Sequence, residues 1–179
     1  RRTACISSQA GCGMGCTFCA TGQMGFTRHL TSAEIFEQAS RFSRELRRRG
    51  ERLSNVVFMG MGEPLANYNN VIEAARRIHD ELGVGARHIT ISTVGLARGI
   101  EKLADDPLPV TLAVSLHQAD DESRSAIMPV NKRYDLEPLL SSINNYQRKT
   151  KRRVTFEWAA IQGENDDEQA ARKLGKLLK

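Results

Sequence analysis

Four cysteines lie close together near the start of the sequence, between Cys5 and Cys19, and the chain contains no others. Disulfides that stabilise small secreted domains usually close long loops by joining distant parts of a chain. Thiols gathered this closely are more typical of metal ligands or reactive groups. Cys12, Cys16 and Cys19 have the spacing C-x3-C-x2-C, and the loop they share is rich in glycine.

This spacing predicts a four-iron, four-sulfur cluster. Three thiolates on one short loop can bind three irons of a cubane. Cys5 stands apart, so the fourth iron is left without a cysteine and is free to coordinate a substrate, much as catalytic zinc keeps an open position. Zinc is the alternative, although structural zinc usually takes two C-x2-C pairs or added histidines, and the nearest histidine in sequence is His29.

Five short β-type runs alternate along the chain with helical segments. Because several runs are nearly continuously apolar, we expect parallel strands covered on both faces. The runs are 4–7, 55–59, 88–92, 110–115 and 154–158.

The helical segments have recognisable ends. Thr31 and Glu34 form a capping-box pattern, and the apolar residues that follow recur on one helical face as far as Leu46. Arginines 47–49 and then Gly50 suit the end of this helix. Further helices are predicted over 70–82, 136–150 and 166–179.

Alternating strands and helices predict an α/β fold with a parallel sheet and right-handed crossovers. An eightfold barrel needs about 250 residues, so we expect an open sheet or a partial (β/α) barrel. All 179 residues fit one domain. Because the last predicted element is a helix with no strand after it, we expect the domain to continue beyond the C-terminal side.

The composition is that of an ordinary globular protein, with 40% hydrophobic and 26% charged residues. No apolar run approaches the roughly 20 residues that span a bilayer, so we expect no membrane contact. No signal-peptide pattern follows Arg1, and the expected location is the cytoplasm, or an organellar stroma or matrix in a eukaryote. A net charge of +5 favours an anionic partner such as nucleic acid.

The cysteine spacing after a first strand, with a glycine-rich element after the second, resembles the radical S-adenosylmethionine superfamily. A wider set of motifs resembles one branch, the dual-specificity 23S ribosomal RNA and transfer RNA adenine carbon-2 methyltransferases. The resemblance extends from about Thr3 to the last residue. Its motifs are Cys5 to Cys12, Thr21 to Phe26, Phe58 to Asn67, Ser92 to Gly95, Ser115 to His117 and Met128 to Lys132.

The resemblance implies two cofactors, a [4Fe-4S] cluster on Cys12, Cys16 and Cys19 and S-adenosyl-L-methionine on its open iron. One electron from the cluster would then cleave the sulfonium and give a 5′-deoxyadenosyl radical. The residues that match cofactor-binding positions of the family are Gly62, Glu63, Ser92, Ser115, Leu116 and His117. A carboxylate at Glu63 suits the ammonium group of the cofactor.

Cys5 matches the family cysteine that takes the proton from adenine carbon 2 and resolves a covalent protein–RNA intermediate through a disulfide. A thiol suits both roles because its pKa is tunable and its sulfur is nucleophilic. The alternative is a buried, inert cysteine.

The sequence also departs from the family. It has no cysteine after Cys19 to match the methyl-carrying cysteine near the family's C-terminus. The sixth strand, with its cofactor-binding asparagine, and the N-terminal accessory RNA-binding domain have no counterpart. We therefore expect residues 1–179 to be the radical S-adenosylmethionine core domain, with five of about six β/α units, unable to methylate RNA alone.

The partners implied are 23S rRNA and tRNA and an electron donor such as flavodoxin, with a monomeric enzyme. Lys132 and Arg133 follow a family motif and are candidate phosphate contacts. Two other basic clusters, 44–52 and 149–153, are equally typical of solvated helix ends. Three alternative functions remain: an adenine carbon-8 methyltransferase, a non-catalytic metal-binding RNA module, and a radical enzyme that acts on a small molecule or peptide.

Overall fold

A five-stranded parallel sheet forms the centre of the computed structural model, which describes residues 1–179. The strands lie in the order β1-β4-β5-β6-β7, and each adjacent pair is parallel. Their bounds are Thr3–Cys5, Asn55–Phe58, Ile89–Thr93, Thr111–Ser115 and Val154–Glu157. The predicted parallel α/β sheet is thus confirmed, and strand order follows sequence order, as in a (β/α) barrel that does not close.

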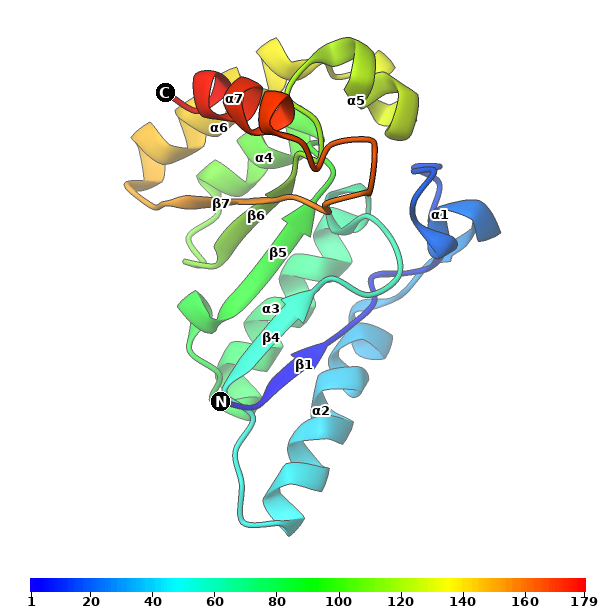
Figure 1. Ribbon diagram of the computed structural model, residues 1–179. Coiled ribbons are helices and arrows are strands. Elements are labelled where there is room, and N and C mark those ends of the chain that lie inside the picture. Colours follow the sequence, from blue (N-terminus) through cyan, green and yellow to red (C-terminus); the bar gives the residue numbers. More distant parts are fainter.

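Each strand is followed by a helix, which gives five β/α units. The principal helices are α2 (Ser32–Arg48), α3 (Tyr68–Leu82), α4 (Ala97–Asp105), α6 (Leu136–Thr150) and α7 (Glu168–Leu177). Figure 1 shows α3 and α4 behind the sheet, while the face toward the viewer carries no helix over β4 and β5. No helix is long and apolar enough to cross a membrane.

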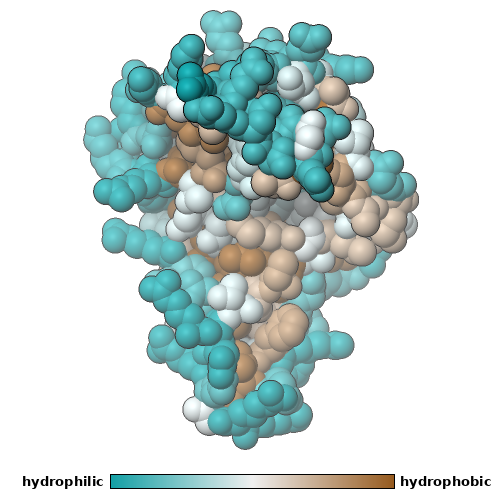
Figure 2. Space-filling view, viewed as in Figure 1, coloured by the Kyte–Doolittle hydropathy of each residue, from teal (hydrophilic) through white to brown (hydrophobic).

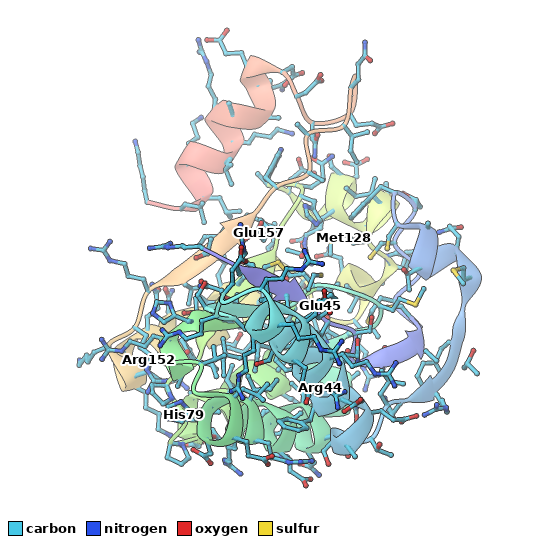
Figure 3. The ribbon with its side chains drawn as sticks, turned by 90° about the horizontal axis from the view of Figure 1, so that it is seen from below. Arg44, Glu45, His79, Met128, Arg152 and Glu157 are labelled. Atoms are coloured by element: carbon cyan, nitrogen blue, oxygen red, sulfur yellow. The ribbon has the colours of Figure 1, made fainter.

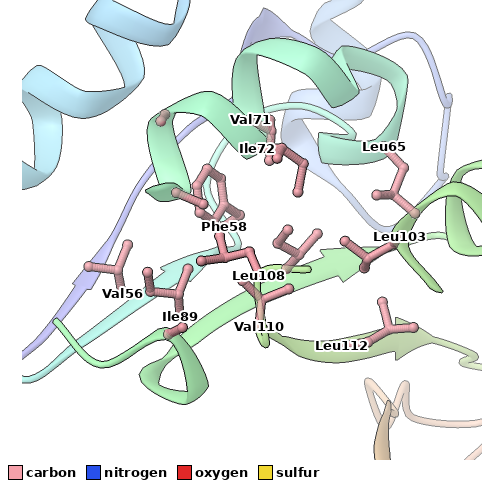
Figure 4. Close-up of a cluster of buried hydrophobic side chains, with 14 of the residues drawn as sticks. Val56, Phe58, Leu65, Val71, Ile72, Ile89, Leu103, Leu108, Val110 and Leu112 are labelled. Carbon is pink, nitrogen blue, oxygen red and sulfur yellow. The ribbon is translucent and has the colours of Figure 1, made fainter. Parts of the chain in front are cut away.

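The hydrophobic core lies between one face of the sheet and these helices. It is a single cluster of 29 buried residues. In Figure 4, Phe58 and Ile89 on the strands face Ile72 and Leu103 on the helices. At about 25 cal/mol per Å² of apolar area removed from water, burial of this layer is the main stabilising contribution.

The opposite face of the sheet is open, contrary to the expectation that both faces are covered. In β5 the buried side chains alternate with the half-buried Thr90 and Ser92. Strand register places Cys5 beside Val57, and Val57 beside Thr90. Figure 2 shows apolar and neutral surface across the middle of this face, between hydrophilic side chains above and below.

Several short elements were not predicted. Two strands, β2 (Gln9–Gly11) and β3 (Phe26–His29), form a small antiparallel pair around the cysteine loop, and the single-turn α1 (Ala20–Met24) lies within it. Helix α5 (Asp121–Ile127) follows β6. The remaining elements are the 3₁₀ turns η1 (Pro64–Asn67), η2 (Ala86–His88) and η3 (Pro129–Lys132).

The predicted capping box at the start of α2 is present. The Thr31 hydroxyl accepts a hydrogen bond from the Glu34 amide, and the Glu34 carboxylate accepts one from the Thr31 amide. At the other end, Arg44 bonds to Glu37, and Arg48 and Arg49 pair with Glu45. Arg44 and Glu45 extend from α2 in Figure 3. These arginines therefore fit an ion-paired, solvated helix end.

Replacing Thr31 by alanine should lower the free energy of unfolding by about 1 kcal/mol, because the Glu34 amide at the N-terminus of α2 loses its acceptor. Urea denaturation measures the effect. Ser32→Ala is the matched control, since no hydrogen bond of the Ser32 side chain is present, and should change stability by less than about 0.5 kcal/mol. Equal effects of the two substitutions would show that the cap contributes nothing.

Candidate functional site

All five strands of the sheet point the same way, so the loops at their C-terminal ends gather at one edge. The cysteine loop follows β1, a Gly60–Glu63 turn follows β4, Val94 follows β5 and His117 follows β6. In parallel α/β proteins this edge is where binding sites form. The site is therefore assembled from segments spread over most of the chain.

The cysteine loop is held by main-chain contacts. The Cys12 amide donates to the Gly25 carbonyl at 2.9 Å, and the Thr17 amide donates to the Ile127 carbonyl at 3.0 Å. Gly11 has φ +76°, and a Cβ there would lie 2.0 Å from the Gly25 oxygen. Only glycine can occupy position 11 in this loop.

Three of the four cysteines meet at one cavity, as the spacing predicted. Cys12, Cys16 and Cys19 line it together with parts of the other loops. Cys12 and Cys16 are buried, and Cys16 packs against Met128. Burial raises the pKa of Cys12, and burial together with the neighbouring thiolates of Cys12 and Cys19 raises that of Cys16 to about 11. Cationic iron would reverse this preference for the protonated thiol.

The geometry of these thiols fits a cluster better than a single metal ion. No three Cys, His, Asp or Glu side chains are grouped closely enough to hold one ion. Tetrahedral zinc needs its thiolates within about 2.3 Å of a common point. A cubane instead distributes its thiolates over separate irons, so three thiols around one cavity satisfy it. His117 lines the same cavity, but it is not grouped closely enough with two of these thiols to hold a single ion.

Glu63 lies at the bottom of the same cavity and is 2% exposed. Its Oε1 accepts hydrogen bonds from the Leu65 amide and the Thr93 hydroxyl, and its Oε2 accepts one from the Val94 amide. A carboxylate offers about four acceptor positions, so one remains on Oε2. Burial raises the pKa of Glu63 to about 7, although these hydrogen bonds stabilise the ionised carboxylate and act to lower it.

The Gly60–Glu63 turn packs directly on Gln9, which lies just before the cysteine loop. Gly62 has φ +99°, and a Cβ at this position would lie 2.5 Å from the Gln9 Cβ and 2.8 Å from its main-chain nitrogen. The Gln9 side chain also accepts a hydrogen bond from the Glu63 amide at 2.9 Å. The glycine at position 62 is thus required for this close approach.

His117 occupies a strained position at the end of β6. Its φ is +60°, its exposed fraction is 8%, and its Nδ1 accepts a hydrogen bond from the Ala159 amide at 2.9 Å. Burial lowers its pKa to about 4, with a further contribution from Arg124. The ring is therefore neutral near pH 7 with its proton on Nε2, and its edge meets Phe18 at 4.8 Å between ring centroids.

The serines lie where they were predicted, at a second cavity that adjoins the first. Ser92 and Ser115 line it with Glu157, and the two cavities share Glu63 and Ser115. Leu116, predicted with them as a cofactor-binding residue, has its side chain fully buried in the hydrophobic core. Its amide and carbonyl are already bonded to Glu157 and Arg124.

Cys5 lies apart from the other three cysteines. It is exposed at the end of β1 and lines neither cavity. Its register neighbour Val57 places it on the open face of the sheet. The structure thus separates one accessible thiol from three thiols that surround a cavity.

Two residues near the site, Arg124 and Glu157, were not predicted from the sequence. Glu157 ends β7 and lies inside the predicted strand 154–158, where its alternation with Phe156 could have placed it on the open face. Arg124 falls in the unpredicted helix α5 and matches no motif. A separate cavity of about 950 Å³ lies among α4, α6 and α7. It is lined by no cysteine or histidine, so it lacks the side chains that the predicted metal site requires.

Glu63→Gln should lower the free energy of unfolding by about 1–3 kcal/mol. In either orientation the new amide group faces a main-chain N–H, of Leu65 or Val94, so one buried donor loses its acceptor. Urea denaturation of the cluster-free protein measures this, with exposed Glu101→Gln on α4 as the matched control.

A comparison of wild type with Glu63→Gln also tests the pKa of Glu63. Its folded-state pKa of about 7 lies above the unfolded value of about 4.3. The stability it contributes is therefore complete below pH 4.3 and is lost as the pH rises through 7. The stability difference between wild type and Glu63→Gln should narrow between pH 5 and 8. A difference that widens with pH would contradict the assignment.

The sequence and the fold of this chain are similar to those of known proteins. A family profile described as the radical SAM superfamily matches residues 6–174. The "Probable dual-specificity RNA methyltransferase RlmN" of Chloroflexus aurantiacus is 53% identical over 100% of this chain and 50% of its own length. The protein of that name from Mycolicibacterium vanbaalenii is 56% identical over 99% of this chain and 50% of its length.

The solved structures include a radical SAM methyltransferase from Sphaerobacter thermophilus, with 46% identity and a TM-score of 0.96 over 99% of this chain and 52% of that one. Streptococcus suis SuiB bound to S-adenosylmethionine, at 14% identity and a TM-score of 0.67, covers 98% of this chain and 37% of its own, and shows the same fold. The chain spans about half the length of the curated relatives it matches. The cysteine loop, the sheet edge and the family profile together show that the chain belongs to the radical SAM superfamily.

Proposed function

We propose that this chain is the core of an enzyme that methylates carbon 2 of adenine in 23S rRNA and tRNA. The observation that carries the proposal is the single cavity lined by three thiols, Glu63, Ser115 and His117. Relatives that are 53–56% identical carry the name of dual-specificity RNA methyltransferases. Superfamily membership implies S-adenosylmethionine and a [4Fe-4S] cluster as cofactors.

Cys12, Cys16 and Cys19 would hold the cluster at one end of this cavity. When bound, the cluster and S-adenosylmethionine supply an electron and a carbon-centred radical, chemistry that no side chain provides. The chain's own contribution is placement. A loop held by main-chain hydrogen bonds fixes the thiols, and Phe18, packed on His117, covers part of the cavity against water.

The remaining residues of the site offer complementary groups to S-adenosylmethionine. The free acceptor position on Glu63 Oε2 suits an ammonium group, because charge-assisted hydrogen bonds are strong in a site shielded from water. Gly62 lets the main chain approach a ligand closely. Ser92 and Ser115 present hydroxyls in the adjoining cavity, and neutral His117 presents an Nε2–H donor.

Cys5 is proposed as the base that takes the proton from adenine carbon 2. Its thiol is exposed on the open face of the sheet, so a substrate base can reach it, whereas Cys12 and Cys16 are buried and Cys19 is partly buried. Five exposed large hydrophobic residues belong to the cysteine segment and the β4 loop and suit contact with a nucleic-acid base. They are Phe18, Met24, Phe26, Met59 and Met61.

RNA contact is proposed at Lys132 and Arg133, which lie at the end of η3 beside the cysteine loop and make no ion pair within the chain. Lys149, in contrast, is paired with Asp105, so this second basic cluster is partly neutralised. We further propose a flavodoxin-type electron donor, a monomeric enzyme and a cytoplasmic location.

Anaerobic reconstitution with iron and sulfide should give about four irons per chain and a reduced electron paramagnetic resonance signal. The signal should change when S-adenosylmethionine is added, because one iron has no protein ligand. Cys16→Ala should abolish the cluster. Cys5→Ala is the matched control and should bind iron like the wild type. Zinc in place of iron, or a signal indifferent to S-adenosylmethionine, would contradict the proposal.

Cys5→Ala should also separate radical generation from methylation. In the complete enzyme, this variant should still cleave S-adenosylmethionine but should form at least about 100-fold less 2-methyladenosine, the lower range for loss of a general base. Mass spectrometry of digested 23S rRNA and tRNA measures the product and distinguishes carbon 2 from carbon 8. Normal methylation by Cys5→Ala would remove the thiol from the mechanism.

A further inference from the structure

Arg124 is a fully buried arginine in α5, with an exposed fraction of 0%. Its Nε donates to the Leu116 carbonyl at 3.2 Å, and its Nη2 donates to the carbonyls of Val94 at 2.7 Å and Ser115 at 3.3 Å. Its Nη1 donates to Asn131 Oδ1 at 2.6 Å. The guanidinium thus joins the loops after β5 and β6 to η3.

Every hydrogen-bond acceptor of Arg124 is electrically neutral, and the residue makes no ion pair with a carboxylate. Buried charges are normally paired, because removal from water is unfavourable and neutral acceptors offset only part of it. Asp121 is linked to Arg124 through Asn131, whose Nδ2 donates a hydrogen bond to Asp121 Oδ1 at 2.9 Å. Asp121 is exposed, so water screens its charge.

The cysteine loop is a further source of negative charge near Arg124, besides the Glu63 carboxylate bonded to the Val94 amide. The carbonyl of Ile127, at the end of α5, accepts a hydrogen bond from Thr17, and Cys16 packs against Ile127 and Met128. Burial lowers the pKa of Arg124 to about 10, while the charges of Asp121 and Cys16 act in the opposite direction. The helix that carries Arg124 is therefore in direct contact with a cluster ligand.

We propose that Arg124 is the fixed counter-charge of the iron–sulfur cluster and makes the cluster easier to reduce. Three thiolates outweigh the double positive charge of an oxidised four-iron core, and one electron from a low-potential donor adds a further negative charge. No bond forms or breaks in this step. Net charge near a cluster is one of the factors that set its potential, and a buried cation stabilises the more negative state.

This inference rests on the cluster proposed above. It assigns Arg124 a positioning and electrostatic role, since its guanidinium is bonded to main-chain carbonyls and an amide rather than directed into the cavity. A purely structural arginine would brace the same loops without affecting the potential. The two roles therefore differ in the midpoint potential, which does not depend on turnover.

The test is a reductive titration of the reconstituted cluster, followed by electron paramagnetic resonance without S-adenosylmethionine. Arg124→Gln should lower the equilibrium constant for one-electron reduction at least tenfold, a fall of about 59 mV. Arg124→Lys keeps the charge and should recover most of that loss. Arg77→Gln, which removes the same charge from a half-buried arginine of α3 that is paired with Glu81, is the matched control and should leave the potential unchanged.

Equal shifts in Arg124→Gln and Arg124→Lys, or no shift in either, would overturn the role of the charge. A wild type that forms no cluster would instead contradict the proposed function.

A second pair of variants applies even where Arg124→Gln fails to fold or to take up iron. Asp121→Asn keeps an oxygen acceptor for Asn131 and Leu136 but removes the carboxylate nearest Arg124. It should raise the midpoint potential, whereas Glu122→Gln, exposed and not bonded to this network, should raise it less. A fall or an equal change in the two variants would contradict the counter-charge.

Discussion

Parallel pairing of the five strands is the constraint on which the site depends. Because every strand runs the same way, the loops after β1, β4, β5 and β6 reach one edge of the sheet, although they are up to about a hundred residues apart in sequence. The helices cover only one face, so the other is free to line a cavity. An antiparallel sheet of the same strands would place alternate loops at opposite edges.

Two buried charged side chains of opposite sign hold these loops in register. Glu63 accepts a hydrogen bond from the Val94 amide, and Arg124 donates one to the Val94 carbonyl. The main chain after β5 is thus fixed between a carboxylate and a guanidinium that do not contact each other. Such charges are unfavourable in an empty protein. In the proposed function they would become favourable, because a cationic ligand would meet the first and an anionic cluster the second.

The predictions from sequence were most accurate for features that depend on residues close together in the chain. The cysteine loop, the five strands, the capping box at Thr31 and the helix 136–150 follow from short patterns, and all are present. The open sheet face was missed because runs such as Val110 to Ser115 are nearly as apolar as strands buried on both sides. Arg124 was missed because its role depends on contacts with Val94 and Asn131, which no periodicity encodes. Leu116 was assigned with its neighbours, although alternation along the chain directs it into the core.

The contacts of the cysteine loop also bear on how the protein is made. Its partners are distant: Gln9 and Ser8 bond to Met61, Gln9 packs on Gly62, and Thr17 bonds to Ile127. Non-local contacts of this kind form late, after the intervening chain has collapsed and paired. During synthesis the loop therefore lacks its final shape until more than two thirds of this chain has emerged. If these thiols hold the proposed cluster, iron and sulfide delivered earlier would meet thiols without their final arrangement, and loading would follow formation of the sheet.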